Sequence, residues 1–177
     1  MNIEDRSEDI YIRVDRLSSI EDIRNLALRY AYAVDSRDWQ MMESLWVETP
    51  ARHQASILDG GTMLDVHVMR EIGARFTDSG PSTLLVANHL IEFDDVDHAR
   101  GSVYCHCQME RSGTFFEQMI LYQDIYERNE GRWLFCSRNH LLWWGAKRAD
   151  DPTQQAPALW PVSQTGAGVA FERIRHL

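Results

Sequence analysis

The chain has 177 residues, of which 44% are hydrophobic and 25% charged, and this favours one globular domain with its own core. Its formal net charge of −9 argues against partners that are polyanions, namely nucleic acid and anionic membranes, because both repel an acidic protein. The six Trp, six Tyr and six Phe residues are enough to line a cavity as well as fill a core.

The three cysteines do not suggest a disulfide framework. Their number is odd, and Cys105 and Cys107 lie two positions apart on one expected strand, while Cys136 follows much later. A reducing compartment is therefore expected. The segment Met1–Arg6 has neither the basic nor the apolar region of a secretory signal, and no run approaches the length of a membrane span. We expect a cytoplasmic protein.

Hydrophobic periodicity predicts a first helix over residues 20–35. A capping box that starts at Ser18 or Ser19 marks its beginning. The apolar positions recur at helical spacing, and they are Ile20, Ile23, Ala27, Tyr30 and Val34. Residues 1–18 are charged and irregular, so they are predicted to form an N-terminal arm.

Shorter elements are predicted to follow this helix. A second helix places four apolar side chains on one side and is closed by Pro50; these side chains are Trp39, Met42, Leu45 and Trp46. Residues 52–58 are compatible with a short strand that ends at a glycine turn. Thr62 is predicted to cap a third helix over residues 64–76.

The second half of the chain predicts four long strands, over residues 82–93, 99–110, 114–128 and 132–144. Short turns separate them, which is typical of an antiparallel meander. Helices followed by hairpins indicate an α+β domain, and strands of this length must curl. A curved antiparallel sheet with helices on its concave face would enclose a cavity. The tail, residues 146–177, is polar, and a short helix near 169–175 is compatible with its sequence.

Three segments resemble the SnoaL-like branch of the nuclear transport factor 2-like superfamily. Leu28–Trp39 resembles the first-helix motif, Thr83–Asn88 the strand motif Thr-His-x-x-x-Asn, and Tyr126–Trp133 the last hairpin. The resemblance runs over residues 19–144. It implies three helices on the concave face of the sheet, a cone-shaped pocket, and a pocket domain over residues 19–145. The branch includes scytalone dehydratase, bile acid dehydratase, lindane dehydrochlorinase and polyketide cyclases.

The resemblance also implies roles for single residues. An Asp at the end of the first helix pairs with a strand His that acts as general base, and a helix Tyr and a late Arg assist in some members. The Asp falls on Asp35, the Tyr on Tyr30 and the Arg on Arg138. The position of the His is Leu84 in this chain, and a position used by an Asp in the bile acid enzyme falls on Cys107.

The residues themselves leave alternatives open at each of these positions. Burial at a helix end would raise the pKa of Asp35, which suits acid/base work, whereas the alternative is that Asp35 opens the turn and hydrogen-bonds Arg37 or backbone amides. An Arg138 that faces a cavity needs a carboxylate partner, and Asp35 is the expected one. His140 shares a strand face with Arg138 and is the substitute base. His89 is a second candidate, although alternation places it opposite Leu84.

The remaining candidate residues are expected to line the pocket, and they are Leu84, Val86, Cys105, Cys107 and Tyr122. The set Cys105-His106-Cys107 is not predicted to bind metal. On a strand the two thiols point one way and the imidazole the other, so they cannot share an ion. We expect neither metal nor cofactor.

Together these features predict a cofactor-independent lyase or isomerase, of the dehydratase or cyclase kind, that acts by proton transfer on a small hydrophobic cyclic, polyketide- or steroid-like molecule. Two alternatives stay open: a small-molecule binding protein that has lost the base, and a structural small subunit of an aromatic-ring oxygenase. Trp143, Trp144, Leu159 and Trp160 are hard to bury on one side of a small domain, so a homodimer or higher homo-oligomer is also expected.

Overall fold

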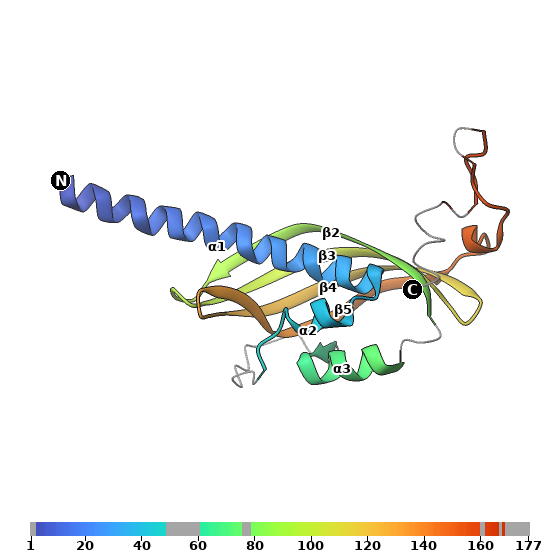
Figure 1. Ribbon diagram of the computed structural model, residues 1–177, viewed down its shortest axis with the longest axis horizontal. Coiled ribbons are helices and arrows are strands. Elements are labelled where there is room, and N and C mark those ends of the chain that lie inside the picture. The colour runs from blue at the N-terminus through green and yellow to red at the C-terminus, as the bar shows by residue number, and fades with distance from the viewer. Residues whose placement is uncertain (1–2, 49–60, 76–78, 160–161, 167, 169–177) are drawn as a thin grey trace.

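A computed structural model describes residues 3–48, 61–75, 79–159, 162–166 and 168. In these residues three α-helices accompany one sheet of five antiparallel strands in the order β1-β5-β4-β3-β2. The strands curve and the helices lie against the sheet (Figure 1). The predicted α+β class, with a curved antiparallel sheet and three helices, is confirmed. None of the helices in the described ranges is long and apolar enough to cross a membrane.

Helix α1, Ile3–Ser36, is much longer than predicted. The expectation of an irregular arm over residues 1–18 and of a cap at Ser18 or Ser19 is wrong, because the helix already begins at Ile3 and passes through both serines. No Gly or Pro interrupts the first 48 residues, so nothing stops the helix from extending toward the N-terminus. The side chains of residues 9–18 are exposed, and the next residue, Ser19, is only 3% exposed.

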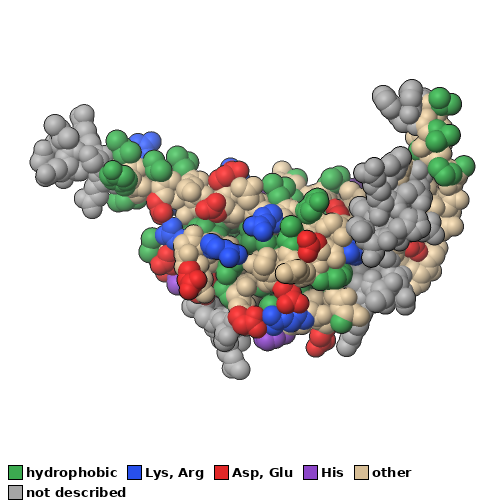
Figure 2. Space-filling view, viewed as in Figure 1, with side chains coloured by type: hydrophobic (Ala, Val, Ile, Leu, Met, Phe, Trp, Pro, Cys, Tyr) green, Lys and Arg blue, Asp and Glu red, His purple; other side chains and the backbone are tan. Residues whose placement is uncertain are grey.

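The N-terminal part of α1 projects past the edge of the sheet (Figure 1). It carries exposed apolar side chains, visible at that end of the molecule in Figure 2: Ile10, Tyr11, Ile12, Val14 and Leu17. Leu142, Trp143 and Trp144 near the end of β5 are exposed as well. These surfaces are where a subunit contact would bury apolar area, and homo-oligomerisation stays a prediction.

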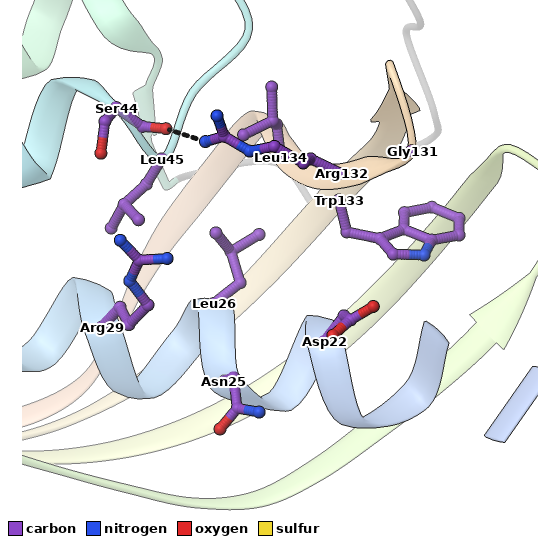
Figure 3. A pocket seen from close by; sticks show the side chains of 10 residues that line it. All are labelled: Asp22, Asn25, Leu26, Arg29, Ser44, Leu45, Gly131, Arg132, Trp133 and Leu134. Carbon is purple, nitrogen blue, oxygen red and sulfur yellow. Dashed lines mark hydrogen bonds between the residues drawn. The ribbon is translucent and has the colours of Figure 1, made fainter. Parts of the chain in front are cut away.

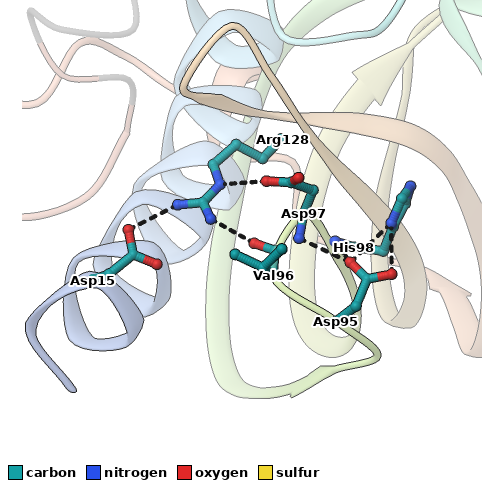
Figure 4. A network of polar contacts seen from close by, with 6 residues as sticks. All are labelled: Asp15, Asp95, Val96, Asp97, His98 and Arg128. Carbon is teal, nitrogen blue, oxygen red and sulfur yellow. Dashed lines mark hydrogen bonds and ion pairs between the residues drawn. The ribbon is translucent and has the colours of Figure 1, made fainter. Parts of the chain in front are cut away.

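One arginine ties the projecting helix to the sheet (Figure 4). Arg128 donates from Nη1 to Asp15 Oδ1 and from Nε to Asp97 Oδ1, both at 2.9 Å. It also donates from Nη2 to the carbonyl of Val96 at 2.6 Å. Its position near the end of β4 thus joins α1 to the turn between β2 and β3.

The two shorter helices begin at aspartates. Helix α2, Trp39–Glu43, is capped by Asp38, whose Oδ1 accepts from the amide of Met41 at 2.8 Å. Helix α3, Val66–Arg75, begins after Asp65, whose Oδ1 accepts from the amide of Val68 at 2.9 Å. The prediction that Thr62 caps this helix is wrong, because the carboxylate of Asp65 serves the first turn.

Strand β1, Thr62–Leu64, occupies the segment in which the third helix was expected to start, and it pairs with β5. The strand predicted over residues 52–58, the helix end at Pro50 and the short helix near 169–175 lie outside the described residues. The described part of the tail forms a short 3-10 turn, Pro152–Gln154.

The predicted meander is confirmed. Its strands are β2 (Ser79–Phe93), β3 (His98–Arg111), β4 (Thr114–Asn129) and β5 (Arg132–Lys147). Two of the turns are two-residue hairpin loops, and Gly113 and Gly131 adopt φ values of 74° and 77° there. A positive φ at both central residues suits the right-handed twist of the flanking strands, and glycine adopts it without steric cost.

A β-bulge at Asn88 changes which residues of β2 face the helices. Asn88 has φ 48°, and the pairing with β3 shifts register between Ala87 and Leu90. Before the bulge Leu84 is buried and Leu85 exposed, whereas after it His89 is half-buried and Leu90 exposed. The prediction that His89 lies opposite Leu84 is therefore wrong, because the extra residue resets the alternation.

Replacing Asn88 tests whether the folded protein requires the left-handed backbone conformation at this position. A left-handed conformation costs a β-branched residue about 1–2 kcal/mol, so Asn88→Val should lower the free energy of unfolding by roughly that amount. Asn88→Gly is the matched control and should leave stability nearly unchanged. Urea unfolding of the three proteins measures this. Equal stability of the Val and Gly variants would show that the bulge is not held in place.

Candidate functional site

The helices and the sheet form a cavity of about 260 Å³ that is partly open to solvent and has a mainly apolar wall. Helix α1 contributes Tyr30 and Val34, and β2 contributes Leu84. Strands β3, β4 and β5 also contribute to the wall, with Cys107, Tyr122 and His140 among their lining residues. Such a space suits a small hydrophobic molecule that would meet few polar groups.

His140 is the one histidine among the described residues that line this cavity. Its ring lies edge-on to that of Tyr122, with 5.6 Å between the ring centroids. Burial lowers the pKa of His140, and the positive charge of Arg138 acts in the same direction. The imidazole is therefore neutral at neutral pH and has a lone pair with which to take a proton.

The other ionisable side chains of the wall keep their protons. Burial raises the pKa of Cys107 to about 12 and that of Tyr122 well above its ordinary value. Burial also raises the pKa of Tyr30, although the charge of Arg138 opposes the shift. Among the described lining residues, His140 is thus the one that can act as a base near neutral pH.

Arg138 lies behind this wall and is fully buried. The predicted pair with Asp35 is wrong, because Arg138 pairs with Asp124 on the neighbouring strand. Its Nε and Nη2 donate to the two carboxylate oxygens, each at 2.7 Å. Burial alone would lower the pKa of Arg138, but the charge and hydrogen bonds of Asp124 raise it above its ordinary value. The guanidinium is therefore charged at every accessible pH.

Three aromatic rings surround the guanidinium. Its Cζ lies 4.2 Å from the ring centroid of Tyr30, 4.1 Å from that of Tyr122 and 4.4 Å from that of Phe135. These contacts are within cation–π range. Its Nη1 is buried without a hydrogen-bond partner in the described structure, so the rings are the neighbours that compensate it. Arg138 thereby orders two of the rings that form the cavity wall.

A chain of hydrogen bonds continues from Asp124 toward β2. The hydroxyl of Tyr126 donates to Asp124 Oδ2 at 2.6 Å, and Nε2 of His89 lies 3.0 Å from the same hydroxyl oxygen. Because the hydroxyl proton points to the carboxylate, its oxygen accepts from His89, which assigns the proton of the neutral ring to Nε2. Burial lowers the pKa of His89 to about 4.

Asp35 joins α1 to β2 and does not belong to the cavity wall. Its Oδ2 accepts from the amide of Leu84 at 3.0 Å, and its Oδ1 accepts from Ser82 Oγ at 3.1 Å. Burial raises the pKa of Asp35, while these two hydrogen bonds and the charge of Arg37 oppose the shift. The pKa shift has the expected direction, but the carboxylate is engaged by the amide of Leu84 and the hydroxyl of Ser82.

The structure divides the expected pocket residues. Leu84, Cys107, Tyr122, Tyr30 and His140 line one cavity. Arg138 and Cys105 are buried behind it and Val86 lines a different hollow. Burial raises the pKa of Cys105 to about 11, so this thiol also stays protonated.

His106 points away from the two cysteines that flank it and lies 2.8 Å from Glu117. The expected alternation along β3 is thus observed. The described residues contain no cluster of three or more His, Cys, Asp or Glu side chains that could hold a metal ion.

Sequence reasoning missed Asp124 and Tyr126. The signal was available in the sequence of β4. Every second residue there faces inward, and these residues are Ile120, Tyr122, Asp124 and Tyr126. A carboxylate in the middle of such an apolar row requires a buried cation, and the pairing of β4 with β5 places Arg138 directly opposite Asp124.

A second hollow of about 440 Å³ lies between α1 and the turn that joins β4 to β5 (Figure 3). Arg29 and Arg132 lie toward one end and Asp22 lies toward Trp133. Arg132 donates to the carbonyl of Ser44 at 3.4 Å. The mixed charges of this hollow do not select one ligand chemistry.

An open, curved sheet with helices over an apolar cavity defines the class of nuclear transport factor 2-like proteins. The sequence matches the SnoaL-like domain over residues 15–139, so the chain belongs to the SnoaL-like family. A comparison with curated protein sequences gives no match.

Solved structures with the same fold include the hexachlorocyclohexane dehydrochlorinase LinA-type3 of Novosphingobium barchaimii, with a TM-score of 0.67, 20% identity, and coverage of 78% of this chain and 96% of that one. A scytalone dehydratase-like protein of Novosphingobium aromaticivorans has a TM-score of 0.64 and 16% identity, with coverage of 81% and 99%. An NTF2-like protein with a cystatin-like fold from the same species has a TM-score of 0.57 and 19% identity, with coverage of 80% and 90%. At these identities the likeness establishes the fold.

The half-buried His89 predicts that the protein loses stability in mild acid. The pKa is about 4 in the folded protein and near 6.5 in the unfolded chain, so the unfolded chain binds the proton more readily. The contribution of His89 is fully present above pH 6.5 and is lost as the pH falls toward 4. With allowance for solvent screening of the half-exposed ring, this is about 1 kcal/mol at pH 5.

Urea unfolding at pH 7.5 and pH 5 checks this expectation. His89→Gln should lose less stability between the two pH values than the unmodified protein, whereas the exposed control His67→Gln should lose as much. An unchanged pH dependence in His89→Gln would contradict the assigned cause.

Proposed function

We propose that this chain is a cofactor-independent lyase or isomerase in which His140 removes a proton from a small hydrophobic cyclic molecule held in the 260 Å³ cavity. The observation that supports the proposal is a neutral imidazole in a mainly apolar wall. A base whose pKa is lowered by burial stays unprotonated at neutral pH.

The rest of the wall suits such a step. Leu84, Met109 and Ile120 offer apolar surface to the body of a substrate. Tyr30 and Tyr122 keep their hydroxyl protons, so they remain neutral and cannot compete with His140 for the proton. Exclusion of water from the cavity would strengthen any interaction with charge that develops on the substrate.

The relatives with the same fold support the same class of reaction without identifying a substrate. Two of those named above are described as a dehydrochlorinase and as a scytalone dehydratase-like protein. Elimination of a leaving group begins with removal of a proton, which is the step assigned here to His140.

Leu84 favours a second function, that of a small-molecule binding protein. In SnoaL-like proteins with the Thr-His-x-x-x-Asn strand motif, the corresponding position holds the His that acts as base, whereas in this chain the apolar side chain of Leu84 lines the cavity. If His140 does not reach the substrate, the same cavity binds its ligand without converting it.

Replacement of His140 separates the two functions. We expect the protein to exchange the acidic C–H protons of 2-tetralone, a bicyclic ketone, with deuterium oxide faster than buffer does. His140→Gln should lower the enzymatic rate by about a hundredfold or more, because general base catalysis contributes roughly 10²–10⁴. Deuterium incorporation is followed by NMR, with the exposed His67→Gln as the control that should keep the full rate.

A gain-of-function variant provides the complementary measurement. Leu84→His should place a second imidazole in the cavity and raise the exchange rate above that of Leu84→Gln. Exchange at the buffer rate in the unmodified protein and in Leu84→His, with 2-tetralone still bound, would contradict the enzymatic proposal and favour the binding protein.

A further inference from the structure

A separate cavity of about 190 Å³ lies between α1 and β2. Its wall is mostly apolar and includes Ala27, Val86 and Val103. The polar residues of the wall are Arg24, Asn88 and His89, and Arg24 and His89 are the two that can carry a positive charge. None of its lining residues belongs to the cavity of His140, so the two spaces are distinct.

The bulge at Asn88 is what brings His89 to this cavity. A non-glycine residue with φ 48° inside a strand stores strain, and bulges commonly re-aim a neighbouring side chain. Without the extra residue, alternation would turn His89 to the opposite face of β2, where it could not contact Tyr126. The strained backbone at Asn88 thus turns the imidazole of His89 toward the cavity.

The hydrogen-bond chain leaves one nitrogen of His89 available. Nε2 donates to Tyr126, whose own proton goes to Asp124. Nδ1 carries the lone pair of the neutral ring and has no hydrogen-bond partner in the described part of the chain. The ring is therefore held in one orientation and one tautomer at the wall of a cavity.

Arg24 supplies a positive charge at the same cavity. No hydrogen bond or ion pair joins its side chain to another described residue, so its charge is not neutralised by a neighbouring carboxylate. It is exposed enough to receive a ligand from solvent. A guanidinium fits a carboxylate in shape and charge.

We propose that this cavity is a second ligand site, which takes a small apolar monocarboxylate whose carboxylate group lies between Arg24 and His89. The apolar body of the ligand packs against the side chains of Ala27, Val86 and Val103. A dicarboxylate or a phosphate ester fits less well, since the remaining wall offers no further cation. This site is independent of the reaction assigned to His140.

Binding at this site is coupled to protonation of His89. The charged or titratable groups around the ring are Arg24 from α1, Asp124 and Tyr126 from β4, and Arg138 from β5, while β3 contributes the apolar Val103. A bound carboxylate compensates Arg24 and accepts a hydrogen bond from a protonated Nδ1. It therefore favours the imidazolium, and by linkage the ligand binds more tightly at lower pH.

NMR of the histidine ring protons tests the proposal, with benzoate and butyrate as the probes. Saturating benzoate should raise the pKa of His89 by roughly one pH unit, from about 4 to about 5, so benzoate should bind about twofold more tightly at pH 5 than at pH 8. Butyrate should act in the same direction, and comparison of the two acids distinguishes an aromatic from a short aliphatic ligand. Arg24→Gln should weaken benzoate binding at least about tenfold.

Two controls keep the outcome unambiguous. His140→Gln should bind benzoate as the unmodified protein does, because His140 lies in the other cavity. Arg24 is on the surface of α1, so its replacement should leave the melting temperature unchanged. The proposal is overturned if benzoate leaves the His89 signals unmoved, if Arg24→Gln binds benzoate normally, or if His140→Gln abolishes binding.

Discussion

The buried ion pair between Arg138 and Asp124 is the interaction on which the rest of the structure depends. Both side chains are at most 1% exposed and lie opposite one another on paired strands. Removing two charges from water costs several kcal/mol for each, and only close geometry with further hydrogen bonds recovers it. The two short contacts between guanidinium and carboxylate supply that geometry.

Each member of this pair contacts a different part of the interior. On one side the guanidinium lies among the rings of Tyr30, Tyr122 and Phe135, which join α1 to β4 and β5. On the other side the carboxylate accepts from Tyr126, and through it fixes His89 at the edge of the sheet. The wall of the apolar cavity and the imidazole of the second cavity therefore share one buried anchor.

Local sequence signals were sufficient for most of the fold. Turn residues such as Gly113 and Gly131 mark the hairpins, and the periodicity around Tyr30 marks the buried half of α1. The long N-terminal extension of α1 could not be read from amphipathic periodicity, because its side chains over residues 9–18 are exposed and no burial imposes an apolar face on them.

The candidate site was predicted less completely. Alternation along β5 correctly places His140 at a cavity wall, but it does not reveal which strand lies opposite Arg138. The carboxylate of Asp35 was therefore assigned to an arginine that Asp124 holds. His89 was misplaced for a related reason, since a bulge at an asparagine leaves no mark in hydrophobic periodicity.

A double-mutant cycle on Arg138 and Asp124 tests most directly whether this pair is the anchor. Arg138→Met leaves a buried carboxylate and Asp124→Asn leaves a buried guanidinium, so each should cost about 3–5 kcal/mol of unfolding free energy. Asn retains an acceptor for the hydroxyl of Tyr126. The double variant buries no charge, so urea unfolding should show it destabilised by at least about 2 kcal/mol less than the sum of the single changes. Strict additivity of the two changes would contradict the account.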